Sequence, residues 1–477
     1  MWLREHALIL VLFALYTGVL VHHALIGQRR TRDLADFLVG GRSLGGIILG
    51  VSFFATYAST NSFIGFAGRA YASGIAWLLI IPTAVVLSFV AWAWLAPRLR
   101  GVTETLGSVT IPDYIGFRFN SRPARFAAAV IVIFSSFLYM TAVFKGIGSL
   151  LVELLDLSYG LSLFVVVLIV CLYTMIGGFH SVARTDFVQG MLMTMAALLM
   201  FFLITRAAGG IGRLADLARI GDGSLVRWDT AQPLGMLIGV VFASTVKLIV
   251  EPRQLSRFYA LETEGAARSG LVVSTLSFLI VFSLLAPLGL YAHFVVGQGI
   301  ADTDQVIPMM LSDPAIFPPV VQALLFLALV SAAMSSLDSV LLVMASTFQR
   351  DLLGLLVPAD DRHAVRNTRV CVVLFAAITA ILAIDPPGGI VELTSFSGAL
   401  YAACFLPSLA LGLTWRRGNG AAALWSFAAG GLTLGLWMLL DIQGMHAVFP
   451  AMAISFAAYC VAAWLAPEAK AAKGLFG

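Results

Sequence analysis

Apolar stretches of about 20 residues recur along the whole chain, with short polar loops between them. A helix of that length crosses the hydrocarbon core of a bilayer. The pattern therefore predicts an all-α multi-pass membrane protein with about thirteen transmembrane helices. The predicted helices cover residues 7–26, 44–69, 74–96, 124–152, 160–177, 187–207, 233–250, 270–295, 318–347, 370–385, 391–414, 421–440 and 448–466.

Two of these helices carry polar residues at mid-depth. Residues 55–62 read Ala-Thr-Tyr-Ala-Ser-Thr-Asn-Ser, and the seventh helix contains Ser244, Thr245 and Lys247. Polar groups at this depth are costly against lipid, but they are tolerated where a helix breaks and faces protein or a water-filled cavity. Ordinary helix packing, which also uses small polar residues, is the alternative, and it is stronger for the seventh helix.

The two weak helices lie five helices apart, near the start of two blocks, 44–207 and 233–414. Each block holds an odd number of predicted helices, so the second block must be inverted relative to the first. Paired weak helices in inverted repeats indicate a midplane binding site of a secondary transporter. We expect one transmembrane domain over residues 1–477, with a flanking helix at 7–26, the two repeats, and two flanking helices at 421–466.

Composition supports a membrane protein and argues against several other classes. Of the 477 residues, 60% are hydrophobic and 11% are charged, whereas soluble proteins are about 25% charged. The first apolar stretch lacks a signal-peptide cleavage site, which favours a retained helix. The four cysteines show neither metal-ligand spacing nor a disulfide framework. The histidines fit no zinc-protease motif, so we expect no enzyme, and the dispersed basic residues predict no nucleic-acid partner.

Basic residues gather in alternate loops. By the positive-inside rule, this distribution predicts a cell-membrane protein with its N-terminus outside and its C-terminus in the cytoplasm. The residues counted in these loops and in the tail are Arg29, Arg30, Arg32, Arg42, Arg98, Arg100, Arg118, Arg122, Arg125, Arg253, Arg257, Arg268, Arg350, Arg362, Arg366, Arg369, Arg416, Arg417, Lys470 and Lys473.

Residues 335–339, Ser-Ser-Leu-Asp-Ser, lie inside the apolar stretch 318–347. Hydroxyls and a carboxylate within the membrane are costly and therefore suggest function. Serine oxygens beside a carboxylate suit a small hard cation better than a soft metal. The alternative is that Ser335 and Ser336 bond back to carbonyls one turn earlier.

Several motifs resemble those of the sodium/solute symporters, the family of sodium-coupled sugar, proline and sialic-acid carriers. They follow the family's order over nearly the whole chain. They are Asp36–Ser43, Ser62–Gly65, Tyr71–Gly74, Thr110–Tyr114, Gly177–Gly178, Thr185–Gln189, Arg257–Tyr259 and Ser335–Ser339.

The resemblance implies a ten-helix core of two inverted five-helix repeats with about three flanking helices, and alternating access coupled to Na⁺. It also implies a sodium site between the broken first core helix and the eighth core helix. Its ligands would be three backbone carbonyls and two hydroxyls, from Ala55, Ala58, Ala332, Ser335 and Ser336.

Some members of that family have a second cation site, and the matching residues here are Asp186, Ser335, Asp338 and Ser339. Asp338 departs from the family pattern, in which a serine is usual; a carboxylate would strengthen cation binding or bind a proton. Structural roles are the alternatives: a buried hydrogen bond for Asp338, and for Asp186 a place in the first turn of a helix, favoured by the dipole.

The resemblance also indicates a substrate region near the two weak helices, with candidate contacts Tyr57, Ser59, Thr60, Asn61, Ser62, Tyr139, Lys145, Ser244 and Lys247. A mid-membrane lysine is costly unless it is paired. Lys247 has Glu251 at i+4 for a helical ion pair, whereas Lys145 has no acidic residue within a turn and would snorkel. The sharper hypothesis is that one or both attract a carboxylate.

We therefore expect a sodium-coupled symporter that imports a small organic anion, such as a monocarboxylate, or an amino acid. Its partners would be this solute and the lipid bilayer, with no obligatory protein partner evident. Two alternatives remain: a proton-coupled carrier that uses Asp186 or Asp338 as the relay, and a transporter-like sensor that acts through a partner protein.

Overall fold

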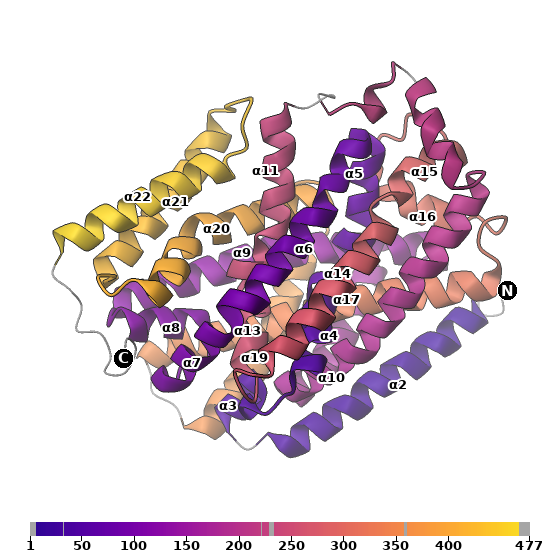
Figure 1. Cartoon of the computed structure of the whole chain (residues 1–477). Coiled ribbons are helices and arrows are strands. Elements are labelled where there is room, and N and C mark those ends of the chain that lie inside the picture. The colour runs from indigo at the N-terminus through magenta and orange to yellow at the C-terminus, as the bar shows by residue number, and fades with distance from the viewer. Residues whose placement is uncertain (1–5, 32, 221, 229–232, 357–359, 467–477) are drawn as a thin grey trace.

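The structure is a computed structural model of the chain, and it describes residues 6–31, 33–220, 222–228, 233–356 and 360–466. Helices make up nearly all of this described part, and Figure 1 shows them as one bundle. The helices that matter below are α2 (Ala7–Arg30), α4 (Gly46–Tyr57), α5 (Phe66–Ser73), α8 (Ile111–Arg118), α9 (Arg122–Leu155), α10 (Tyr159–Ala207), α11 (Leu234–Thr245), α12 (Lys247–Val250), α13 (Pro252–Tyr259), α14 (Ala267–Leu285), α17 (Pro319–Thr347), α19 (Asp361–Leu382), α20 (Ile390–Thr414), α21 (Gly420–Leu439) and α22 (Val448–Leu465).

Eleven helical segments of the described chain are long and apolar enough to cross a membrane. Two of them, Asn61–Leu106 and Tyr159–Ala207, hold 46 and 49 residues, about twice the length of one crossing. The predicted all-α multi-pass architecture is therefore confirmed, and each predicted apolar stretch lies mostly in helix. Of the basic residues counted for orientation, Arg32, Lys470 and Lys473 lie outside the described residues, as do the ends of the predicted 1–477 domain.

Helix α10 changes direction at Gly178, between the predicted stretches 160–177 and 187–207. Gly178 has φ 58° and ψ −164°, a conformation that residues with a Cβ rarely adopt. A Cβ at this position would also lie 2.7 Å from Cδ2 of Phe37. Glycine therefore permits both the turn and the close approach of the preceding segment.

Both helices with polar mid-sections are broken, as predicted. Helix α4 ends at Tyr57, the backbone is extended at Ala58 (φ −69°, ψ 90°), and helical structure resumes as a π-helical turn at Asn61–Gly65 that leads into α5. The seventh stretch ends as α11 at Thr245, continues as the short α12, and breaks again at Glu251 (φ −78°, ψ 126°) before α13 begins. These breaks remove carbonyls and side chains from regular helical bonding near the middle of the bundle.

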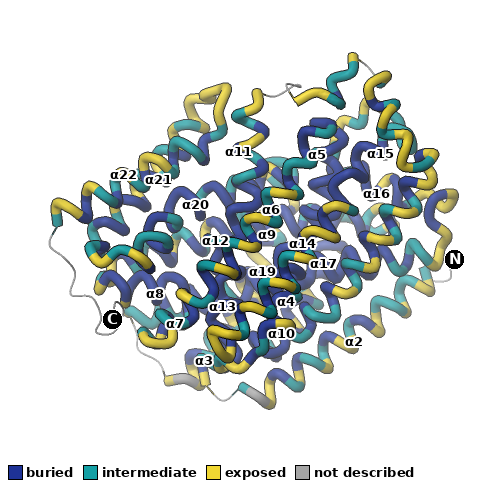
Figure 2. Tube along the Cα trace, in the orientation of Figure 1, coloured by how far each residue is buried: buried dark blue, intermediate teal, exposed yellow. Residues whose placement is uncertain are grey.

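The centre of the bundle is formed by α17 and the helices around it. Helix α17 packs against α9 and α10, and α4 packs against α10 and α14. In the most apolar window of α17 78% of the residues are buried, compared with 17% for α2. Figures 1 and 2 show α2 on one side of the bundle and α21 with α22 on the other, both with many exposed positions.

Ion pairs tie helices together near both ends of α9. Near its start, Arg125 bonds Asp113 and Asp351, at 2.8 Å each. Twenty residues further along, Lys145 Nζ lies 2.8 Å from Asp304 Oδ2, and this separation in one helix corresponds to about 30 Å. Polar contacts therefore hold the bundle together on both sides of its centre.

Candidate functional site

The broken end of α4 faces α17 at the predicted sodium site. Ser335 Oγ donates to the carbonyl oxygen of Ala55 (3.0 Å) and lies 3.1 Å from that of Ala332. All five predicted ligand residues are fully buried: Ala55, Ala58, Ala332, Ser335 and Ser336. The structure thus brings oxygen atoms of α4 and α17 together where the break at Ala58 frees backbone groups.

Ser336 adds a carbonyl that the sequence did not indicate. Its Oγ donates to the carbonyl oxygen of Thr56, at 2.9 Å. The same oxygen accepts from Nη1 of Arg253, at 2.5 Å. Thr56 therefore belongs to the site, and it connects the site to a buried arginine on α13.

These residues fit a small hard cation. Backbone carbonyls and hydroxyls are the neutral oxygen ligands that such ions take in proteins. Among the described residues, no group of three or more His, Cys, Asp or Glu side chains could hold a metal ion. The donor set of Ala55, Ser335 and Ser336 is therefore suited to Na⁺ and unsuited to a transition metal.

The second predicted cation region is assembled around an arginine. Arg257 Nη2 lies 2.7 Å from Asp186 Oδ2 and 2.7 Å from Ser339 Oγ, and it also contacts the Thr56 hydroxyl. Asp186 Oδ2 accepts a further bond of 2.5 Å from Ser52. The carboxylate of Asp186 is thus paired with a protein cation.

Asp338 lies beside this cluster without an ion pair of its own in the described structure. Its Oδ1 accepts from Ser339 Oγ and its Oδ2 from the Tyr173 hydroxyl, both at 3.1 Å. Among the described residues, the Ser335 hydroxyl bonds only to first-site carbonyls. Three of the four predicted residues, Asp186, Asp338 and Ser339, are therefore linked to one another through hydrogen bonds, and Ser335 lies with the first site.

The dipole account of Asp186 is wrong. The helical segment that carries Asp186 begins directly after the turn at Gly178, so Asp186 stands two turns inside it. The dipole effect is confined to about the first turn. The bonds to Ser52 and Arg257 account for this buried carboxylate instead.

The predicted substrate residues contribute a group of buried polar atoms that lack hydrogen-bond partners within the described chain. Tyr57 and Ser59 are bonded: the Tyr57 hydroxyl donates to the Ser244 carbonyl (2.7 Å), and Ser59 Oγ accepts from the Asn61 amide (3.2 Å). Buried polar atoms normally have a partner, and the role of these residues as substrate contacts stays a prediction. The atoms are Thr60 Oγ1, Asn61 Oδ1, Ser62 Oγ, the Tyr139 hydroxyl and Ser244 Oγ.

Lys247 is buried in this region, and the expected ion pair with Glu251 does not form. Its Nζ lies 5.5 Å from the ring centre of Tyr57 and 5.0 Å from that of Tyr139. Glu251 instead pairs with Arg253, at 2.8 Å. The backbone leaves the helix at Glu251, so the i+4 rule no longer places its carboxylate beside Lys247.

Lys145 does not share the surroundings of Lys247. Its ammonium group binds Asp304 Oδ2 at 2.8 Å, and the same oxygen accepts from the Ile390 amide at the start of α20. Its charge is therefore matched inside the protein by a residue far away in the sequence. A role for Lys145 as a substrate contact stays a prediction.

Arg253 and Arg257, which the sequence predicts to lie in a loop, lie inside the bundle. Each side chain is 1% exposed, and Arg253 also lies over the Tyr139 ring, with Cζ 3.9 Å from its centre. Their i, i+4 spacing in a short segment between apolar stretches was the available signal. Because that segment continues a broken helix, its charges lie in the bundle and not at the membrane surface.

Comparison with known proteins is consistent with this geometry. Residues 37–430 match the profile of the sodium:solute symporter family. The chain is 28% identical to the osmoregulated proline transporter OpuE of Bacillus subtilis over 465 residues, which cover 94% of this chain and 93% of the relative. It is also 28% identical to the sodium/pantothenate symporter of Haemophilus influenzae, with 91% of each chain covered.

The fold has a close match among solved structures. A Na⁺-coupled sialic acid symporter superposes with a TM-score of 0.83 at 18% identity, covering 98% of this chain and 99% of that one. This match confirms the ten-helix core of two inverted repeats with flanking helices. The relatives are carriers and not enzymes, and they support sodium as the coupling ion. The chain belongs to the sodium:solute symporter family.

Proposed function

We propose that the protein imports a small carboxylate-bearing solute, a monocarboxylate or an amino acid, together with Na⁺. The main support for this proposal is Lys247. It is a buried cation that has aromatic neighbours but no carboxylate within ion-pairing distance in the described structure. A buried charge without a partner is costly. A substrate carboxylate would remove that cost when it binds.

The charges around Lys247 favour an anion. With Lys247 protonated, Lys247 and Arg253 carry two positive charges and Glu251 carries one negative charge, so this buried group has a net charge of +1. Arg253 Nη2 and Glu251 Oε2 have no hydrogen-bond partners among the described residues. The group therefore offers both a positive field and an unused donor to a monoanionic headgroup.

The relatives named above point to the same chemical class. Their names specify proline, pantothenate and sialic acid, and each of these solutes bears a carboxylate. This similarity supports a carboxylate substrate here, and the unpartnered hydroxyl and amide oxygens of Thr60, Asn61 and Ser62 suit the polar remainder of such a molecule.

Coupling between ion and solute would pass through the broken end of α4. Ala55 and Thr56 lend carbonyls to the serines of α17, while Tyr57 holds α11 through the Ser244 carbonyl. Na⁺ would supply a positive charge that draws the α4 carbonyls and the α17 hydroxyls together. A solute on the Tyr57 side would stabilise the same three residues, so each ligand favours the binding of the other.

The test is uptake by purified protein in proteoliposomes. The solutes are radiolabelled proline, pantothenate, sialic acid and lactate, with glucose as an uncharged control. We expect saturable uptake of at least one carboxylate that requires an inward sodium gradient. Uptake that follows a pH gradient without sodium would establish the proton-coupled alternative, and binding without uptake would favour a sensor.

Lys247 is then tested in the same assay against a matched lysine. Lys247→Met should raise the half-saturation concentration about tenfold or more, because a desolvated charge pair is lost. Lys145→Met should leave that concentration within about threefold, since Lys145 is already paired with Asp304. An unchanged affinity in Lys247→Met contradicts carboxylate recognition by this residue.

We base the orientation of the chain in the membrane on the basic residues that lie at the surface or in the ion pairs near the ends of the bundle. We place the end that carries Arg98, Arg122 and Arg350 in the cytoplasm, with the N-terminus outside, since positive loops favour that side. Fluorescent and periplasm-active reporter fusions at the two termini test this assignment. A reporter active in the cytoplasm at the N-terminus would reverse it.

A further inference from the structure

Arg257 occupies the position where a second cation was expected. Its Nη2 lies 2.7 Å from Asp186 Oδ2 and 2.7 Å from Ser339 Oγ, and its Nε donates to Ser52 Oγ at 3.1 Å. A guanidinium is charged at any physiological pH. One arginine therefore joins α4, α10 and α17 and carries one fixed positive charge into the cluster.

The contacts of Asp186 are concentrated on one oxygen. Oδ2 accepts from Ser52 (2.5 Å), Thr56 (3.2 Å) and Arg257 (2.7 Å). Oδ1 is buried and has no hydrogen-bond partner among the described residues. The charge of Asp186 is thus matched by the guanidinium, while one of its oxygens remains unused.

Asp338 is the other carboxylate of this cluster. It is fully buried, and its hydrogen-bond donors, Ser339 and Tyr173, are neutral hydroxyls. The chain Asp186, Thr56, Ser339, Asp338 is continuous, because Thr56 Oγ1 and Ser339 Oγ are 3.3 Å apart. With both carboxylates ionised, the two carboxylates and one guanidinium give the cluster a net charge of −1.

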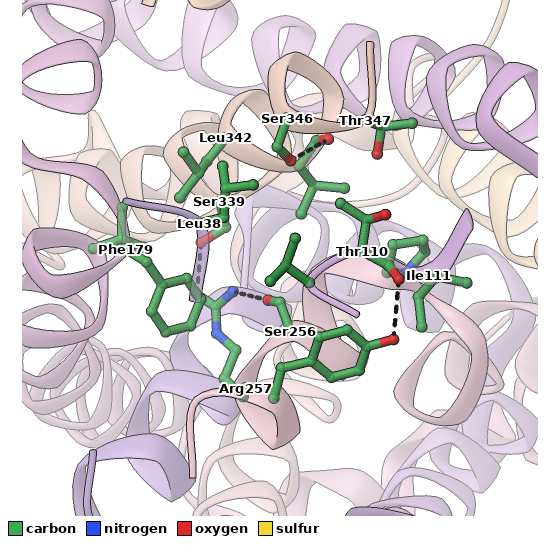
Figure 3. Close-up of a pocket in the computed structure, with 15 residues that line it drawn as sticks. Leu38, Thr110, Ile111, Phe179, Ser256, Arg257, Ser339, Leu342, Ser346 and Thr347 are labelled. Carbon is green, nitrogen blue, oxygen red and sulfur yellow. Dashed lines mark hydrogen bonds between the residues drawn. The ribbon is translucent and has the colours of Figure 1, made fainter. Parts of the chain in front are cut away.

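Arg257 also forms one boundary of a small cavity of about 20 Å³, which is enough for about one water molecule. Figure 3 shows its guanidinium beside Ser256 and Ser339, with Thr110 and Thr347 across the cavity. Arg257 and Ser339 line this cavity, whereas Asp186, which is bonded to that guanidinium, does not. The arginine therefore separates Asp186 from the cavity.

We infer that Arg257 is the resident cation of this second region, that it neutralises Asp186, and that Asp338 alone supplies the charge that attracts a transported monovalent cation. In this arrangement Asp186 sets the charge balance and is not itself a ligand of the ion. The region then has charge for one further monovalent cation and not for two. The inference rests on the sodium coupling proposed above.

The test is equilibrium binding of ²²Na⁺ to the purified full-length protein, with four variants: Asp186→Asn, Arg257→Gln, the double variant of both, and Asp338→Asn. Asp186→Asn and Asp338→Asn each remove the net negative charge and leave Arg257 facing the incoming ion. Both should weaken sodium binding about tenfold or more, since an unbalanced charge a few ångströms away repels a cation even at an effective dielectric constant of about 20.

The double variant distinguishes charge balance from ligation. Asp186→Asn with Arg257→Gln restores the net charge of −1, so its sodium affinity should return to within about threefold of the native value. Asp338→Asn alone leaves one carboxylate and one guanidinium, a net charge of zero. A double variant that binds sodium as weakly as Asp186→Asn would overturn the inference and make Asp186 a direct ligand, and so would a native affinity in Asp186→Asn alone.

Folding is followed by thermal unfolding with and without sodium. If Asp186→Asn or Arg257→Gln fails to fold, the double variant still decides, because it restores the native net charge of −1 and its affinity is compared directly with the native protein. Absence of saturable ²²Na⁺ binding to the native protein contradicts sodium coupling, and with it this inference. Native binding without rescue in the double variant contradicts the inference alone.

Discussion

The Ser336 hydroxyl lies 2.9 Å from the carbonyl oxygen of Thr56, across the contact between α17 and the broken end of α4. Arg253 donates to the same oxygen from the solute side. A single backbone carbonyl thus connects the helix that holds the predicted sodium-site hydroxyls with the charged group proposed to meet the solute. A displacement of the Thr56 carbonyl would therefore change the surroundings of both the Ser336 hydroxyl and the Arg253 guanidinium.

Removing the Ser336 hydroxyl should weaken sodium binding. Ser336→Ala should raise the sodium concentration for half-maximal ²²Na⁺ binding about tenfold, because a bond to an ion is worth about 1.5–3 kcal/mol. Ser336→Thr keeps the hydroxyl and should stay within about threefold of the native protein. The control is Ser331→Ala, which removes a buried hydroxyl of the same helix that donates to the Ala328 carbonyl. Equal losses in Ser331→Ala and Ser336→Ala would refute a specific role.

Much of the fold follows from apolar length and from where polar residues interrupt it. The break at Ala58 and the second break before α13 were both predictable, because Ser59 to Ser62 and Lys247 cannot face lipid. The pairing of charges was not. Asp186 and Arg257 are 71 positions apart, and only the assembled bundle brings them together.

The failed pair between Lys247 and Glu251 shows the physical limit of reasoning from spacing. The i+4 rule holds while the chain remains helical. At Glu251 the backbone becomes extended, so the carboxylate turns toward Arg253 and leaves the lysine to the rings of Tyr57 and Tyr139. Spacing is thus least informative at a break, which is where a transporter of this kind places its site.

Lys145 and Asp304 should behave as a coupled structural pair. Their side chains are 16% and 9% exposed, so either Lys145→Met or Asp304→Asn leaves a poorly solvated charge. Each single change should cost about 1–3 kcal/mol of stability. The double variant should cost less than the sum by about 1 kcal/mol or more. Thermal unfolding of the four proteins gives this coupling energy, and strict additivity would show that the pair contributes nothing.

Gly178 should be intolerant of a side chain, in contrast with Gly160 of the same helix. Gly178→Ala adds a Cβ at positive φ and 2.7 Å from the Phe37 ring, with an expected cost of about 2–4 kcal/mol. Gly160 has open space around its Cα, so Gly160→Ala should be neutral or stabilising by up to about 1 kcal/mol. Thermal unfolding in detergent compares the two. A stable Gly178→Ala protein would mean that the turn in α10 is easily remodelled.

His446, in the connection between α21 and α22, should make stability depend on pH. Burial lowers the pKa of this imidazole from 6.5 to about 4, so the folded state resists protonation more than the unfolded chain does. The contribution of neutral His446 to the free energy of unfolding is present above pH 6.5 and is lost as pH falls from 6.5 toward 4. The loss is at most about 1.4 kcal/mol per pH unit. His446→Gln cannot titrate. The difference in melting temperature between native and variant proteins should change within that window and be constant above it; a constant difference throughout would exclude His446 as the source.

The network near the start of α9 should be costly to disrupt, because its two carboxylates are fully buried. Arg125 pairs with both Asp113 and Asp351, whereas within the described part of the chain the Arg350 side chain bonds Asp113 alone, through its Nε, and is 30% exposed. Arg125→Met leaves Asp351 without a cation and should cost about 3–5 kcal/mol. Arg350→Met leaves Asp113 paired with Arg125 and should cost about 1 kcal/mol or less.

Adding Asp351→Asn to Arg125→Met should recover part of the lost stability, since the unpaired charge of Asp351 is removed. Thermal unfolding ranks these variants, and equal losses for Arg125→Met and Arg350→Met would show that burial of Asp351 does not govern the stability of this end of the bundle.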